Sequence, residues 1–212
     1  CRLCAALQQW DDALRRAAAE MDFMEKGGIR ALTLNDDSYP QRLRSCPDAP
    51  VVLYYKGSAD FNQRYVVDIV GTRHCTTYGQ DLLRRFVGRL RELCPQVLIV
   101  SGLAYGIDAA AHRGCLKGGS PTVAVMGCGL DVDYPQEHGR MKNEILEKGG
   151  VLISEYPPGE KPLGWHFPVR NRIISGLAYG IDAAAHLDGE SLSARREELA
   201  GAVEVMAALC AE

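Results

Sequence analysis

The sequence predicts an α/β fold, in which a mostly parallel sheet is covered by helices and a small N-terminal appendage precedes it. Between residues 61 and 177, an apolar segment, a glycine-containing turn and a helical segment recur in that order. The apolar segments are nearly continuous, which is typical of parallel strands buried on both faces. The 212 residues, 47% of them hydrophobic and 24% charged, suit one such domain with an appendage.

The appendage is predicted over residues 1–60. Residues 4–26 fit a helix that ends at two glycines, with an apolar stripe that includes Ala13, Ala17, Ala18 and Met21. Residues 29–34 and 51–55 fit short strands, because turn-forming residues separate them and follow the second.

The main domain is predicted over residues 61–177. Its strands are expected at 65–70, 97–100, 122–126 and 151–154. Its helices are expected near 77–93, 106–117 and 137–148, and a last helix is expected to begin near Phe167.

Glycines follow three of the predicted strands, at Gly71, at Gly102, and at Gly127 with Gly129. Ligands of parallel sheets bind at the carboxyl ends of strands, where glycine lets the backbone approach them and free N–H groups attract anions. Glycine at such a turn is more often needed only for a tight turn. Neither a dinucleotide-binding G-x-G-x-x-G after the first strand nor a P-loop is present, so no cofactor is expected.

The segment 156–172 is basic and aromatic. It contains the cations Lys161, Arg170 and Arg172, the amide of Asn171, and the aromatic residues Tyr156, Trp165 and Phe167. Arginine binds phosphate oxygens, and exposed aromatic rings stack on bases. An equally weighted alternative has Trp165 and Phe167 in the core and the arginines paired with Glu155 and Glu160.

Composition limits the other possibilities. The net charge of −3 disfavours a nucleic-acid binder unless the cations cluster. The eight cysteines are scattered, as is typical of reduced cytoplasmic thiols, and Cys1 and Cys4 lack the second ligand pair of a zinc site. No apolar run is long enough to span a membrane. Because the chain starts at Cys1 without a signal-peptide pattern, we expect a fragment of a longer protein.

Five motifs, in order, resemble those of the DNA-processing protein A (DprA or Smf) family. They are IVGTR at 69–73 with Tyr78–Gly79, VSGLAYGIDAAAH at 100–112, VMGCGLD at 125–131 with Tyr134–Pro135, SEYPPG at 154–159, and FPVRNRII at 167–174. The resemblance covers roughly residues 29–177 and implies a Rossmann-like domain.

The resemblance also implies a function. Members of the family bind single-stranded DNA in natural transformation and recombination, protect the incoming strand, assist loading of the RecA recombinase, and form homodimers. It implies a cytoplasmic binding protein rather than an enzyme. The implied phosphate-binding residues are Gly71, Thr72, Arg73, Ser101, Gly102, Lys161, Arg170, Asn171 and Arg172, and Phe167, together with Trp165, is expected to stack on bases.

The sequence departs from the family pattern at two places. Asp68 lies inside the first strand of the main domain, where a buried carboxylate is costly unless it is paired, or where solvent reaches the strand. The twelve residues at 101–112 recur at 175–186, after a different lead-in. Residues 178–212 are therefore predicted to be an atypical helical tail, with Ser193 as a helix cap and Leu199, Val203, Met206 and Leu209 on one face. We expect this end to disfavour normal dimerisation.

Three alternatives remain open from the sequence. A phosphoribohydrolase-like enzyme would use Asp108, His112, Glu155 or His166, with Asp108 and His112 close enough on one helix to pair. That enzyme class carries a Pro-Gly-Gly-x-Gly-Thr turn, which is absent here. A nucleotide sensor would use the same glycine turns for a small ligand. A truncated chain would have no function.

Overall fold

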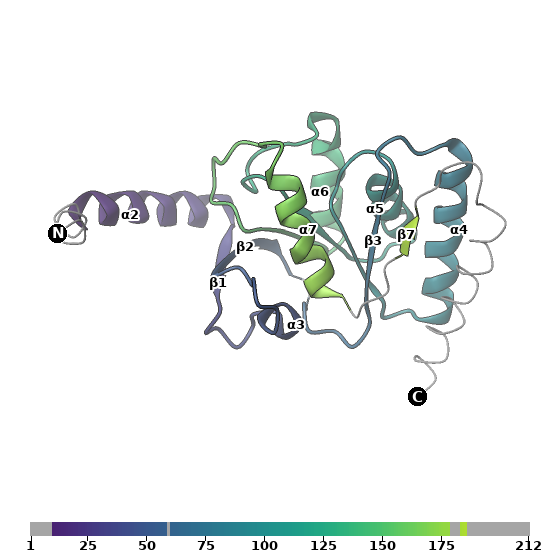
Figure 1. Cartoon of the computed structure of the whole chain (residues 1–212), viewed down its shortest axis with the longest axis horizontal. Coiled ribbons are helices and arrows are strands. Elements are labelled where there is room, and N and C mark those ends of the chain that lie inside the picture. The colour runs from purple at the N-terminus through teal and green to yellow at the C-terminus, as the bar shows by residue number, and fades with distance from the viewer. Residues whose placement is uncertain (1–9, 59, 179–182, 186–212) are drawn as a thin grey trace.

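The computed structural model describes residues 10–58, 60–178 and 183–185. They form a seven-stranded sheet in the order β1-β2-β6-β5-β4-β3-β7 (Figure 1). The strands are β1 (Arg30–Thr33), β2 (Val52–Gly57), β3 (Val66–Gly71), β4 (Leu98–Ser101), β5 (Thr122–Met126), β6 (Val151–Ser154) and β7 (Ala183–Ala185). The helices are α2 (Trp10–Gly27), α3 (Gln41–Arg44), α4 (Thr77–Leu93), α5 (Ile107–Lys117), α6 (Gly139–Glu147) and α7 (His166–Leu177), with a 3₁₀ turn at Gln136–His138.

The parallel strands β3, β4, β5 and β6 form the centre of the sheet. Every residue of β4, β5 and β6 is buried, and alternate side chains enter different cores. On β5, Val123 and Val125 pack with Ile173 and Ile174 of α7, whereas Ala124 and Met126 pack with Ile145 of α6. The predicted α/β fold with a mostly parallel, helix-covered sheet is confirmed.

The predicted appendage continues this sheet. Strand β1 pairs antiparallel with β2, and β2 pairs antiparallel with β6. Helix α2 instead projects from the body, has no buried residue, and leaves its predicted apolar stripe exposed, with Met21 at 69% (Figure 1). Contacts with the body are made near the C-terminal end of the helix, where Met24 packs against the core and the Tyr54 hydroxyl donates to Glu20 at 2.8 Å.

The duplicated sequence adopts two structures. In the first copy, Ala109, Ala110 and Ala111 lie in α5; in the second, the matching Ala183–Ala185 form β7, which pairs in parallel with β3. The repeat within the predicted tail of 178–212 is thus a strand at 183–185, because the open edge of β3 offers backbone partners. The tail helix predicted after residue 186 and the Cys1–Cys4 pair lie outside the described residues.

Three further findings bear on the sequence-based expectations. Asp68 is only 3% exposed, so the alternative of a solvent-facing strand is wrong. The cysteines within the described ranges, Cys46, Cys75, Cys94, Cys115 and Cys128, are free thiols. Among the described helices, none combines the length and the apolar character needed to cross a membrane.

A buried histidine links the stability of the fold to pH. His112 is fully buried on α5, and its Nδ1 lies 3.0 Å from Thr122 Oγ1, which itself donates to the Ile99 carbonyl. Burial, assisted by the positive charges of His138 and Arg170, lowers the pKa of His112 from 6.5 to about 3. In the unfolded chain, His112 therefore binds a proton once the pH falls below 6.5. In the folded chain, it binds that proton only near pH 3.

We predict that the free energy of unfolding falls as the pH decreases from 6.5 toward about 3. His112 alone should contribute up to about 1.4 kcal/mol per pH unit to this fall. Urea unfolding of the wild type and of His112→Gln between about pH 7 and about pH 5 measures it. The wild type should lose about 2 kcal/mol more than the variant over this range. Equal losses would contradict the assignment of the acid sensitivity to His112.

Candidate functional site

Three loops and the start of α7 meet at the carboxyl edge of the parallel strands. They are residues 71–76 after β3, 102–106 after β4, and 127–135 after β5. They enclose a pocket of about 50 Å³, lined by Arg73, Gly102, Ala104, Tyr105, Met126, Gly127, Tyr134, Pro135 and Phe167. The structure thus brings the three glycine turns and part of the basic and aromatic segment together at one place.

Glycine allows the first two loops to touch. Gly106 has a φ of 75°, and a Cβ at this position would collide with the carbonyl oxygen of Thr72. The Ile107 N–H donates to that same oxygen at 3.2 Å. At Gly71, a Cβ would lie 2.7 Å from Cγ1 of Ile107. The turn that carries Arg73 is therefore fixed against the start of α5.

Arg170 lies beneath the loops and joins them. It is 3% exposed, and its Nη1 donates to the carbonyl of Gly102 at 2.7 Å and to the carbonyl of Val125. Asp108 Oδ2 accepts hydrogen bonds from the N–H groups of Gly102 at 3.1 Å and Ala104 at 3.4 Å. Burial raises the pKa of Asp108, and the charge of Arg170 opposes this rise. Arg170 was predicted to contact a phosphate, but its Nη1 is buried and already donates to two backbone carbonyls.

Arg73, by contrast, lies at the surface. Its guanidinium carbon is 5.6 Å from the ring centroid of Phe167, and it forms no ion pair with any described residue. Phe167 is half-buried, and its centroid is 5.1 Å from that of Tyr134 at an interplanar angle of 31°. A solvated cation thus stands beside a pair of aromatic rings, an arrangement suited to an anionic aromatic ligand.

The other predicted site residues are dispersed. Ser101 is buried, and its hydroxyl donates to the Ile69 carbonyl at 2.6 Å. Arg172 pairs with Glu155 at 2.6 Å and Asp48 at 3.5 Å, so the alternative of structural pairing with Glu155 is confirmed for this arginine. Lys161, Asn171 and Trp165 are exposed. Trp165 is 62% exposed, so the alternative that placed Trp165 in the core is wrong.

The residues considered for catalysis have separate partners. Asp108 binds backbone N–H groups and His112 contacts Thr122, so the expected pairing between Asp108 and His112 is replaced by these contacts. His166 is buried, its Nδ1 lies 3.1 Å from the Gly127 carbonyl, and its ring stacks on Tyr156 with centroids 3.9 Å apart. These side chains therefore support the fold at different points.

Two tyrosines that line the pocket were not among the site residues predicted from the sequence. Tyr105 and Tyr134 are 43% and 39% exposed and line the pocket from the second and third loops. The Tyr105 hydroxyl donates to Glu137 at 2.6 Å, and its ring lies 5.2 Å from His138. Both tyrosines belong to the family-like motifs, but no neighbouring cations or aromatic residues in the sequence draw attention to them.

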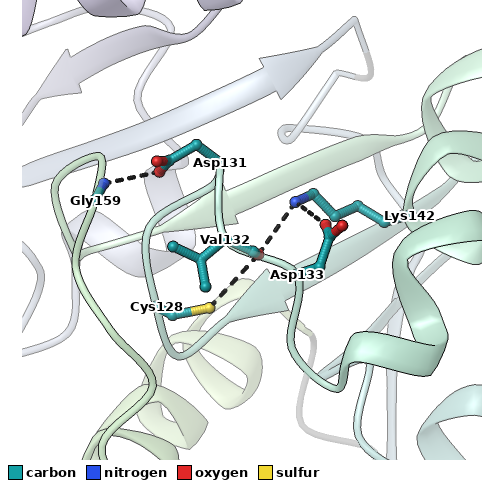
Figure 2. A network of polar contacts seen from close by, with 6 residues as sticks. All are labelled: Cys128, Asp131, Val132, Asp133, Lys142 and Gly159. Carbon is teal, nitrogen blue, oxygen red and sulfur yellow. Dashed lines mark hydrogen bonds and ion pairs between the residues drawn. The ribbon is translucent and has the colours of Figure 1, made fainter.

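The loop that carries Tyr134 is held by a polar network (Figure 2). Lys142 of α6 donates to the Val132 carbonyl at 3.1 Å and to Asp133 at 2.7 Å. On the other side of the loop, Asp131 accepts a hydrogen bond of 2.8 Å from the Gly159 N–H. Because contacts from two other segments fix the backbone on the N-terminal side of Tyr134, its ring has a defined place beside Phe167.

Comparison with known protein families gives one family match. The family described as DNA recombination-mediator protein A matches residues 30–182. DNA processing protein DprA of Streptococcus pneumoniae is 44% identical over 154 residues, which are 73% of this chain and 53% of that protein. Protein Smf of Escherichia coli is 34% identical over 186 residues, which are 82% of this chain and 49% of that protein. The chain thus spans about half the length of these relatives.

Two solved structures have the same fold. The X-ray structure of DNA processing protein A from Streptococcus pneumoniae has a TM-score of 0.66 and 40% identity, and the match covers 81% of this chain and 60% of that one. The protein from Helicobacter pylori, whose structure describes a unique single-stranded DNA binding mode, has a TM-score of 0.64 and 27% identity. That match covers 83% of this chain and 77% of that one.

We predict that Arg170→Ala lowers the free energy of unfolding by about 3–5 kcal/mol, because it removes a donor from two buried carbonyls and leaves Asp108 without a nearby cation. Urea unfolding measures this loss. Arg89→Ala is the control, because Arg89 pairs with Glu92 at the surface and its loss should cost less than about 1 kcal/mol. Similar losses in both variants would contradict the structural role of Arg170.

Proposed function

Because the chain belongs to the DNA recombination-mediator protein A family, we propose that it binds single-stranded DNA at the carboxyl edge of its sheet. The observation that supports this most directly is the position of Arg73, exposed and without an ion pair among the described residues, beside the rings of Phe167 and Tyr134. A single strand offers phosphates and unstacked bases within a few ångströms of each other. The site combines groups that bind both.

The size of the pocket favours a strand that lies across the site. A volume of about 50 Å³ is far below the roughly 300–1,000 Å³ of sites that enclose small ligands. The tyrosine rings that line it are open to solvent, with Tyr105 and Tyr134 at 43% and 39% exposure. Bases can therefore stack at the rim while Arg73 binds a phosphate. This favours single-strand binding over a sensor that encloses a mononucleotide.

The same arrangement favours binding over catalysis. Asp108, His112 and His166 are buried and engaged in hydrogen bonds that support the fold. They do not converge on the pocket, which none of them lines. We therefore propose a binding protein rather than a phosphoribohydrolase-like enzyme.

The wider role of the protein is part of the same proposal. Protection of incoming DNA, assistance to RecA, homodimer formation and a cytoplasmic location rest on membership of the family. The described free thiols accord with a reducing compartment. Among the predicted contacts, Gly71, Thr72 and Gly102 shape the pocket, and Arg170 and Ser101 support it from below. The exposed Lys161 and Asn171 would meet a longer strand outside it, whereas Arg172 is held by Glu155 and Asp48.

The proposal predicts that a labelled oligo-dT strand binds with an affinity that falls with salt and resists competition by ATP and duplex DNA. Arg73→Ala should weaken binding to every strand sequence and reduce the log–log salt slope by about 0.7, the value for one phosphate contact on a single strand. Fluorescence titration across a salt series measures both quantities.

The control for this titration is Arg16→Ala. It removes the same charge from exposed α2, which projects away from the body (Figure 1). Displacement of the strand by ATP, or unchanged binding in Arg73→Ala, would contradict the proposed site.

A second prediction concerns stacking. Phe167→Leu keeps an apolar side chain beside Gly127 but removes the aromatic face, so binding of oligo-dT should weaken by about 1–3 kcal/mol if one base stacks there. The salt slope should stay at the wild-type value, because no phosphate contact is lost. A reduced salt slope with unchanged affinity at low salt would be inconsistent with a stacking role.

A further inference from the structure

We propose that a second groove, beside the pocket and between the start of α4 and helix α5, binds the phosphodiester backbone of the same strand. This inference rests on the proposed single-strand binding and extends its footprint to residues that neither the family motifs nor the pocket identify. The groove is lined by Arg73, His74, Gln80, Tyr105, Arg113 and His138, among others. The ligand would be the sugar–phosphate backbone of nucleotides adjacent to the one at the pocket.

The groove is continuous with the pocket. Arg73 and Tyr105 line both cavities, so a strand held at the pocket can enter the groove without leaving the surface. The two residues come from the first and second loops, which Gly106 holds together. The shared wall therefore keeps a fixed shape, and the ring of Tyr105 lies where the strand would pass from one cavity to the other.

The groove has the room that the pocket lacks. Its volume is about 680 Å³, against about 50 Å³ for the pocket. Because the groove is open to solvent, this volume accommodates one or two nucleotides of a strand that passes along it. The strand would place a base at the rim of the pocket and continue into the larger space.

The charge of the groove suits phosphate. Its described lining contains the guanidinium groups of Arg73 and Arg113 and the imidazoles of His74 and His138, and no carboxylate. Arg113 is exposed on α5 and forms no ion pair within the part of the chain that the structure describes. The nearby carboxylate of Glu137 lies outside the described lining and accepts a hydrogen bond of 2.6 Å from the Tyr105 hydroxyl, which lowers the pKa of Glu137 and keeps it ionised. Two arginine charges thus line one groove in a chain whose net charge is −3.

Polar groups in the groove add to this fit. The side chain of His74 is exposed. The backbone N–H of His74 donates to Thr72 Oγ1 at 3.2 Å, which orders the turn that carries Arg73. Gln80 on α4 presents an amide that can bind a phosphate or sugar oxygen. These groups lack sequence-reading geometry, so the groove should accept any base sequence.

The test compares strand lengths in Arg113→Ala and in a matched control, Lys117→Ala. Lys117 is exposed at the end of the same helix and lies outside the described groove lining, so both variants lose one charge from α5. Binding of thymidine monophosphate and of an oligo-dT of about 16 nucleotides is titrated across a salt series.

Arg113→Ala should bind thymidine monophosphate like the wild type, since a single nucleotide at the pocket does not extend into the groove. It should bind the long strand about fivefold more weakly, with a salt slope smaller by about 0.7. Lys117→Ala should match the wild type on both ligands. Equal binding of the long strand by Arg113→Ala and wild type, or equal losses in the two variants, would overturn the groove while leaving the pocket in place. Failure of the wild type to bind any strand would instead overturn the proposed function, and the groove with it.

Discussion

The candidate site depends on the buried guanidinium of Arg170. Its hydrogen bonds to the carbonyls of Gly102 and Val125 join the second loop to the end of β5. Taking this charge out of water is costly, and the carbonyls and the charge of Asp108 offset that cost. With this connection in place, the loops close around the pocket, and Arg73 is left with its charge in solvent.

Helix α7 supplies both the support and the contact surface. Phe167 and Arg170 are three residues apart and so share a face, with the ring at the pocket and the guanidinium 5.9 Å from its centroid beneath the loops. The network around Lys142 fixes Tyr134 on the opposite wall. The chain is acidic overall, but Arg73 and Arg113 form no ion pair among the described residues, which leaves their charges available to phosphate.

The sequence predicted the central strands and the glycine loops because their signals are local. These signals are runs of apolar residues and positions that only glycine can occupy. It did not predict which cations are available, because Arg170 and Arg172 have the same chemistry as Arg73 and differ only in their partners after folding. It did not separate the two copies of the duplicated segment either. Identical alanines form a helix beside β3 in one copy and a strand on its edge in the other, so their neighbours decide their structure.

Hydrogen–deuterium exchange with and without a saturating oligo-dT strand tests the central claim most directly, because it reports on the whole backbone at once. The account predicts slower exchange in residues 72–76, 103–106 and 133–135, with α2 and the β1–β2 hairpin unchanged. Protection confined to β1, β2 or α2, with the three loops unaffected, would contradict a single-strand site at the carboxyl edge of the sheet.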